Sequence, residues 1–200
     1  MNELLIDYIL SLTNLLGIVP FDLVLHTYND QNKKDMDTKN FNNIIEDKSN
    51  YIVSKGITFK SNEFISSEII LLNKYDYIKS NRREIPAYIP NRFNLLRYRN
   101  KEYFEKGKEY ISLYKYLKKH LNHGGLAEEV ANKIGIYCMS IRGTSNIGFI
   151  FSQYRLEFDE KSRLEIQELI DELGRNSRRW ELNGFTENEL KEGDNQEKRP

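Results

Sequence analysis

The order of hydrophobic periods in the first third of the chain constrains the fold more than any other feature. Apolar residues recur at spacings of three and four over residues 4–16 and 20–28 and, more briefly, over 37–48, which predicts three amphipathic helices. Gly17 marks the expected end of the first helix, and Pro20 suits the first turn of the second because no N–H is needed there. The chain therefore starts as three short helices.

A β-hairpin is expected directly after the third helix. Residues 51–53, 57–59 and 64–65 are rich in β-branched and aromatic side chains, and the polar pair Ser61-Asn62 separates the last two runs. Three helices followed by a hairpin are the outline of a winged helix-turn-helix. We therefore expect a winged-helix-like unit over residues 1–73.

The remainder of the chain is expected to be helical. Residues 74–100 are interpreted as a basic connector with short helices, in which Pro86 and Pro90 bracket an extended stretch. Residues 101–190 are predicted to form a helical domain, and the charged residues 191–200 a flexible tail. The predicted fold class is mainly α: a winged-helix-like N-terminal unit with a small β-hairpin, packed on a helical C-terminal domain.

Periodicity predicts three helices in the second domain, over 101–121, 126–139 and 159–173, with an apolar stretch of ambiguous structure at 147–154. The first helix carries tyrosines and leucines on one side and four lysines on the other. Trp180 is the only tryptophan. It is expected to plug the core, since a large aromatic is more often buried packing than a binding site.

Residues 176–190 form a distinctive pattern, NSRRWELNGFTENEL. This segment resembles one in uncharacterised bacterial proteins that often carry a C-terminal SEC-C zinc motif. Residues 12–20 look like the opening motif of those proteins, and Tyr103-Phe104-Glu105-Lys106 with the tyrosine-rich helix after it resembles their central portion. The resemblance implies a mostly helical protein with a winged-helix-like N-terminal unit, and it implies no settled activity.

The same segment departs from that pattern and also has a plain structural interpretation. Phe185 and Glu187 replace the usual His and Pro, and the Cys-rich zinc motif does not occur in the 200 residues. Asn183-Gly184 is a strong turn dipeptide, and Thr186 with Glu189 has the spacing of a capping box for a short final helix. Neither zinc nor another cofactor is expected.

A zero net charge hides a basic middle. Thirty basic side chains balance thirty acidic ones over the whole chain. Residues 74–119, however, carry 13 basic against 5 acidic side chains, and the segments on either side each have a net charge of −4. Any contact with a polyanion should therefore centre on this stretch.

Catalytic chemistry finds little support in the sequence. Cys138 lies in an apolar helical stretch where an inert buried thiol is expected, and no nearby His or acid completes a nucleophilic site. His120 and His123 have a spacing that fits one helix face but lack a third metal ligand nearby. The acidic run at 157–161 is typical of a helix start. We therefore predict a non-enzyme with no catalytic residue and no metal.

The chain is expected to be cytoplasmic. Its N-terminus lacks a basic region followed by an apolar run and a cleavage site, and its longest apolar stretches are far shorter than the roughly 20 residues that span a membrane. A single cysteine forbids an internal disulfide. Abundant Asn, Lys and Ile favour an AT-rich bacterial or phage gene, and no membrane partner is expected.

Two kinds of binding function remain open. The first is a non-enzymatic bacterial or phage protein that binds another protein as a regulator or inhibitor, because thirteen tyrosines suit interfaces. A homodimer stays open as well. The alternative is a winged-helix protein that binds DNA or RNA through the basic, tyrosine-rich middle. For either function, the candidate contact residues form one basic face: Lys55, Lys60, Arg82, Arg83, Arg97, Arg99, Lys101, Lys108, Lys115 and Lys119.

Overall fold

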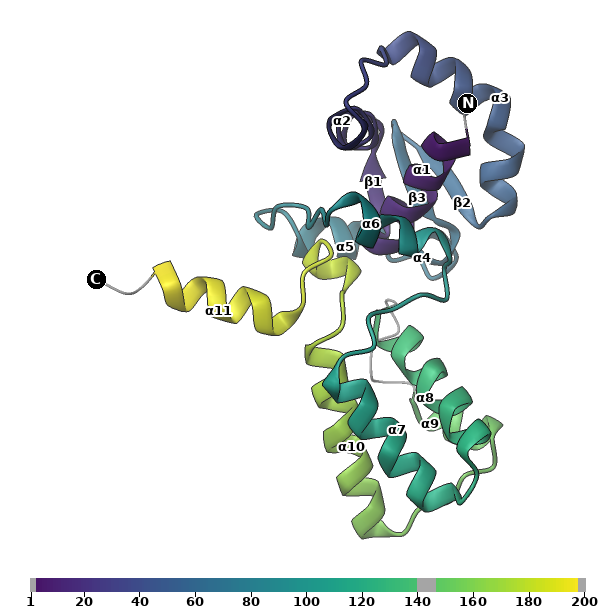
Figure 1. Ribbon diagram of the computed structural model, residues 1–200, viewed down its shortest axis with the longest axis vertical. Helices are drawn as coiled ribbons and strands as arrows, with labels where there is room; N and C mark the ends of the chain where they lie inside the picture. The colour runs from purple at the N-terminus through teal and green to yellow at the C-terminus, as the bar shows by residue number, and fades with distance from the viewer. Residues whose placement is uncertain (1–2, 140–146, 198–200) are drawn as a thin grey trace. The chain divides into compact units, whose positions relative to one another are not determined.

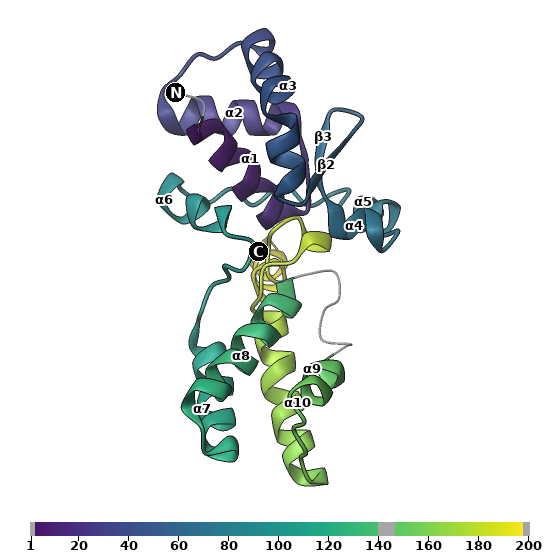
Figure 2. The ribbon, with the colours of Figure 1, turned by 90° about the vertical axis from the view of Figure 1, so that its right-hand side faces the viewer.

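The computed structural model describes residues 3–139 and 147–197, the last four of these as backbone only. It is mainly helical, with one small three-stranded antiparallel sheet. The chain divides into two compact units, Met1–Tyr103 and Phe104–Pro200, which Figures 1 and 2 show from two sides. Among the described helices, none is both long enough and apolar enough to span a membrane.

The first unit combines helices with the sheet. Its first six elements are α1 (Glu3–Leu16), β1 (Ile18–Pro20), α2 (Phe21–Asn32), α3 (Thr38–Ser54), β2 (Ile57–Lys60) and β3 (Glu63–Ser66). Short helices complete it: α4 (Ser67–Leu71), α5 (Tyr75–Asn81), α6 (Arg92–Leu95) and the 3-10 helix η1 (Leu96–Arg99). Residues 74–100, which the sequence indicates as a connector between domains, thus lie inside the first compact unit.

Helix α1 is the centre of this unit. Leu5, Ile9 and Leu12 are fully buried, as its apolar spacing predicts. The connector residues pack on the same helix, because Tyr98 of η1 is 1% exposed and its carbonyl accepts a hydrogen bond from Asn14 Nδ2 at 2.8 Å. This long-range contact explains why the segment joins the first unit.

The predicted hairpin is confirmed and gains a third strand. β3 lies in the middle of the sheet, in the order β1–β3–β2, and both of its pairings are antiparallel. A two-residue turn joins β2 to β3, with φ values of 50° at Ser61 and 61° at Asn62, the left-handed geometry that matches the twist of a tight hairpin. β1 is only three residues long and ends in Pro20, and the sequence did not indicate it.

Helix α3 is longer than the sequence predicts. Residues 51–53 continue the helix instead of opening the hairpin, because Phe41, Ile45 and Ile52 lie on one buried face at helical spacing. Asp37 is the N-cap of this helix, since its Oδ1 accepts the N–H of Asn40 at 2.7 Å.

The second unit is built from helices. They are α7 (Lys108–Leu121), α8 (Gly124–Met139), α9 (Ile147–Gln153), α10 (Glu160–Arg175), the 3-10 helix η3 (Trp180–Leu182) and α11 (Glu187–Glu197). Helices α7, α8 and α10 pack against one another. Their inward faces bury Leu113, Leu117, Val130, Ile134, Ile166 and Ile170. The ambiguous stretch at 147–154 is therefore mostly helix α9.

Two expected boundaries in this unit are wrong. Residues 101–107 precede α7 and are not helical, because Phe104 packs its ring against Gly135 of α8, where a Cβ would lie 2.3 Å from Phe104 Cε2. Residues 187–197 form α11, so the predicted short final helix extends beyond residue 190 into the segment predicted as a tail. Residues 198–200 lie outside the described part of the chain.

Candidate functional site

The basic residues predicted to form one face are divided between the two units. Those in the first unit are Lys55, Lys60, Arg82, Arg83, Arg97, Arg99 and Lys101. Those in the second are Lys108, Lys115 and Lys119. Lys101 was expected to share a helix with these three lysines, but it lies before α7. The ten cations are therefore divided into two groups on two units, and the predicted stripe of four lysines on one helix is reduced to the three on α7.

Arg82 is a buried residue at the end of α5. Its side chain is 9% exposed. Nη1 donates to the carbonyl of Leu16 at 3.0 Å, and Nη2 donates to the carbonyl of Ile18 at 2.8 Å. Burial lowers the pKa of the guanidinium, and the nearby Glu63 carboxylate opposes that shift. Arg82 thus ties α5 to the end of α1 and to β1, contrary to its place in the predicted contact face.

Most other cations of the first group contact side chains of their own unit. Three lie over aromatic rings: Lys55 over Tyr51 at 5.0 Å, Lys60 over Tyr75 at 4.1 Å and Arg97 over Tyr103 at 4.6 Å. Arg99 Nη1 lies 3.3 Å from Asp7 Oδ2. Arg83 and Lys101 are exposed. The rings of Tyr51, Tyr75 and Tyr103 therefore each have a cation of the same chain over them.

The three lysines on α7 do share one side of that helix. Lys108, Lys115 and Lys119 are exposed and lie opposite the buried Leu113 and Leu117. Lys108 Nζ lies 3.8 Å from a carboxylate oxygen of the adjacent Glu109. A lysine row opposite an apolar stripe is the ordinary outer face of a surface helix.

The outer face of α3 is electrically balanced. Its two lysines, Lys39 and Lys48, balance the charges of Glu46 and Asp47, and Lys48 Nζ lies 2.8 Å from Asp47 Oδ2. Because affinity for nucleic acid depends mainly on neutralising phosphates, a helix with no net charge attracts a polyanion weakly.

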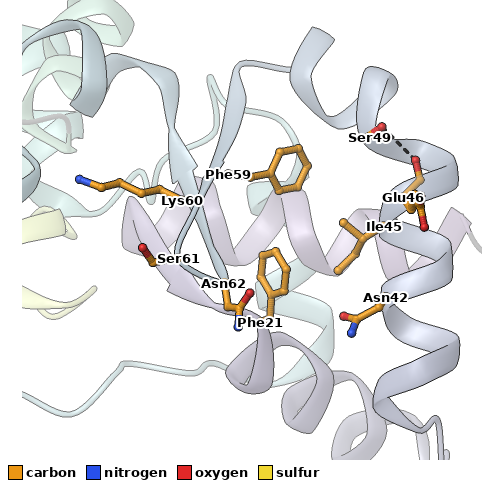
Figure 3. Close-up of a pocket in the computed structure, with 9 residues that line it drawn as sticks. All are labelled: Phe21, Asn42, Ile45, Glu46, Ser49, Phe59, Lys60, Ser61 and Asn62. Carbon is orange, nitrogen blue, oxygen red and sulfur yellow. Dashed lines mark hydrogen bonds between the residues drawn. The ribbon is translucent and has the colours of Figure 1, made fainter.

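A groove of about 470 Å³ lies between α3 and the β2–β3 hairpin (Figure 3). The rings of Phe21 and Phe59 lie side by side on one wall, and the side chain of Ile45 on α3 faces them across the groove. The two ring centroids are 6.4 Å apart, with the rings nearly perpendicular at 88°. Both phenylalanines are half-buried, so part of each ring is open to a ligand. The rim is polar and consists of Asn42, Glu46, Ser49, Lys60, Ser61 and Asn62.

Local hydrogen bonds hold both walls of the groove. The N–H of Phe21, at the start of α2, donates to the carbonyl of Asn62 in the hairpin turn at 2.9 Å. On the α3 wall, Ser49 Oγ donates to the carbonyl of Glu46 at 2.9 Å. The side chain of Lys60 leaves on the far side of the hairpin (Figure 3). Glu46 is therefore the charged side chain that remains on the groove.

A second hollow, of about 570 Å³, lies where α2 meets α3. Its lining residues are Tyr28, Lys34, Asp35, Met36, Asn40, Asn43, Ile44 and Asp47. Tyr28, the one aromatic ring among them, is 5% exposed, so this hollow offers a ligand little open aromatic surface.

The residues considered for catalysis have structural roles. Cys138 is 1% exposed, and burial raises the pKa of its thiol to about 12, so the thiolate is scarce at neutral pH. His120 Nε2 lies 3.1 Å from Ser162 Oγ, and His123 Nδ1 accepts the N–H of Leu126 in α8 at 3.0 Å. Within residues 3–139 and 147–193, no group of three or more His, Cys, Asp or Glu side chains could hold a metal ion.

Within the distinctive segment 176–190, two backbone hydrogen bonds close a loop between Arg179 and Phe185. The N–H of Arg179 donates to the carbonyl of Phe185 at 3.2 Å, and the N–H of Gly184 donates back to the carbonyl of Arg179 at 2.9 Å. Trp180, inside this loop, is 7% exposed and packs as the predicted plug.

The end of the same segment is fixed by charge and by a helix cap. Arg178 is buried. Its Nε lies 3.4 Å from Glu105 Oε2, and its Nη1 lies 2.5 Å from Glu189 Oε2. The predicted capping box is confirmed, because Glu189 Oε2 accepts the N–H of Thr186 at 3.0 Å and Thr186 Oγ1 accepts the N–H of Glu189 at 3.1 Å. These contacts attach the start of α11 to its unit.

No family model matches the chain, and neither a curated protein nor a solved structure does. The assignment of a site therefore depends on the geometry of this chain alone.

Sequence reasoning missed the groove between α3 and the hairpin. The spacing of Phe21 with Val24 and Tyr28 predicts a core position, but Phe21 is the first residue of α2 and lies at the margin of the core. Phe59 was predicted only as part of the hairpin, and it lies near the turn on an outer strand. The one signal in the sequence that could have indicated the groove is that both phenylalanines lie near the end of a predicted helix or strand, where a side chain is less often fully buried.

Proposed function

We propose that this chain is a non-enzymatic protein-binding module that acts as a regulator or inhibitor, and that its partner protein contacts the groove between α3 and the hairpin. The open aromatic surface carries the proposal, because Phe21 and Phe59 are half-buried in a concave site of about 470 Å³. Interface cores are enriched in aromatic side chains and surrounded by a polar rim, which is the composition found here.

The order of elements in the first unit supports a winged-helix-like interpretation. The chain runs α1, β1, α2, α3, β2, β3, and the sheet order is β1–β3–β2. In such folds the third helix and the hairpin frame the functional surface. We include in the proposal the resemblance to bacterial proteins associated with the SEC-C motif, which implies the same kind of unit.

Nucleic-acid binding is the second candidate. Exposed Asn42 and Asn43 on α3 favour it, because amide side chains can read base edges. The balanced charge of α3 and the burial of Arg82 oppose it.

Fluorescence anisotropy with labelled single- and double-stranded DNA and RNA separates these two functions. We expect no submicromolar binding at low salt. Submicromolar binding that falls steeply between about 50 and 200 mM salt, and that is lost in a Lys39→Glu, Lys48→Glu double variant, would contradict the protein-binding proposal.

A random peptide display library, selected on the full-length protein, tests the proposal directly. We expect enriched peptides whose affinity falls by about tenfold or more in Ser49→Trp, because an indole at this position fills the groove. Asn50→Trp is the matched control, since Asn50 is the next residue of α3 and does not line the groove. Peptides that bind both variants equally, or no enrichment at all, would refute the proposal.

A further inference from the structure

We propose that the occupant of this groove is an extended segment of the partner protein, which adds a fourth strand to the free edge of β2 and places a large apolar side chain in the groove, against the rings of Phe21 and Phe59. This inference depends on the proposed function and specifies the chemistry of the partner. It follows from the hydrogen-bonding pattern of the sheet, the shape of the groove and its charge.

Phe59 presents free backbone groups at the edge of the sheet. A two-residue turn joins Lys60 to Glu63, and residues that close such a turn exchange hydrogen bonds. Bonded and non-bonded pairs alternate along antiparallel strands, so Phe59, opposite Phe64, is a non-bonded position. Its N–H and C=O therefore point away from β3.

The other side of β3 confirms this alternation independently. The N–H of Ser66 donates to the carbonyl of Gly17 at 2.8 Å, just before β1. Because bonded pairs recur at every second residue, the backbone N–H and C=O of Phe64, two residues earlier, bond to Val19 on β1 and not to β2. The backbone groups of Phe59 thus have no partner on β3.

The opposite edge of the sheet is closed. The outward carbonyl of Ile18 on β1 accepts the hydrogen bond from Arg82 Nη2 at 2.8 Å. Pro20, the other outward residue of β1, has no N–H to offer. A carbonyl that already accepts a hydrogen bond from a charged side chain, and a proline on the edge, both block strand pairing. β2 is therefore the edge of the described sheet that can accept a strand.

The groove lies where the side chain of an added strand would go. Residues directly opposite each other on antiparallel strands project to the same face of a sheet. Phe59 projects into the groove toward α3 (Figure 3). The residue that pairs with Phe59 would therefore project there too, beside the ring of Phe21 and below α3, and a volume of about 470 Å³ admits a bulky aromatic or aliphatic side chain.

The charge beside the groove selects a peptide and disfavours a polyanion. Lys60 Nζ lies 4.1 Å from the centre of the Tyr75 ring, away from the groove. Glu46 lines the α3 wall and forms no ion pair with another residue of the described chain. We therefore expect a Lys or Arg two residues from the apolar anchor of the partner segment, where its side chain lies on the same face of the added strand as the anchor.

Backbone N-methylation of a synthetic peptide tests strand addition. The probe is the consensus peptide from the display selection, methylated at one amide at a time and titrated by calorimetry against the full-length protein. We expect the affinity to fall by about tenfold or more when the anchor amide, which pairs with the Phe59 carbonyl, is methylated. Methylation of the amide on either side of the anchor should change the affinity by less than about threefold, because those amides point away from β2.

The outcomes separate this inference from the proposed function. If every N-methyl peptide binds equally while Ser49→Trp still abolishes binding, the groove binds a partner and strand addition is wrong. If no peptide binds in a groove-dependent way, both proposals fall. If sedimentation shows a dimer that Ser49→Trp dissociates and that the peptide displaces, the occupant is a second copy of this chain, which overturns the partner-segment assignment.

Discussion

Replacing Arg82 with methionine should destabilise the first unit. Methionine keeps an apolar side chain of similar length but has no hydrogen-bond donor. The carbonyls of Leu16 and Ile18 would lose donors that now lie 3.0 and 2.8 Å away. Arg83→Met is the matched control, because Arg83 is the next residue and is exposed.

The magnitude follows from two opposing contributions. Hydrogen bonds from a charged donor contribute about 1.5–3 kcal/mol each, so the two bonds together account for roughly 3–6 kcal/mol. Methionine avoids the cost of burying a guanidinium, which offsets a part of that loss. We therefore expect the free energy of unfolding to fall by about 2–4 kcal/mol, which for a unit of this size lowers Tm on the order of 10–20 °C.

Hydrogen exchange of peptides that contain β1 and β3, measured in increasing urea, gives the stability of this region directly. Arg82→Met should lose protection at a lower urea concentration than the wild type, while Arg83→Met should stay within about 0.5 kcal/mol of it. Equal stability of the two variants, together with weaker ligand binding by Arg82→Met alone, would refute the reasoning and return Arg82 to the binding surface.

Two further predictions concern the second unit. Gly135→Ala should lower the free energy of unfolding by about 1–3 kcal/mol, because the new Cβ would lie 2.3 Å from the Phe104 ring. Gly148→Ala is the control, because no atom lies within 4 Å of its Cβ. In thermal unfolding, its free energy of unfolding should stay unchanged or rise by up to about 1 kcal/mol. Cys138 should react with iodoacetamide only after unfolding. Since burial raises its pKa from 9.0 to about 12, the unfolded chain loses the proton first, and stability should decline as pH rises through that window. An identical decline in Cys138→Ala would contradict this assignment.

Local periodicity predicted the helices and the hairpin because those signals lie within a few residues of one another. It was wrong where local preference and packing disagreed. Residues 51–53 are β-branched or aromatic, yet Ile52 continues the buried face that Phe41 and Ile45 begin, so the helix extends to Ser54. The apolar spacing over the whole helix was the better guide.

Features that depend on distant residues could not be predicted from the sequence. β1 is three residues long and exists because it pairs with β3, more than 40 residues later. The burial of Arg82 depends on the carbonyls of Leu16 and Ile18, more than 60 residues earlier. The candidate groove likewise joins α2, α3 and β2, and the sequence indicated Phe21 only as a member of a buried helix face and Phe59 only as part of the hairpin.

The unequal edges of the sheet limit how this protein can assemble. Two copies that paired β2 against β2 would be related by a twofold axis, and Arg82 and Pro20 would close the outer edge of each copy. Such a pairing is isologous and cannot repeat, so it ends at two chains and does not propagate into a filament. A ligand strand on β2 would use up the same single edge, and binding and self-association through this sheet are therefore mutually exclusive.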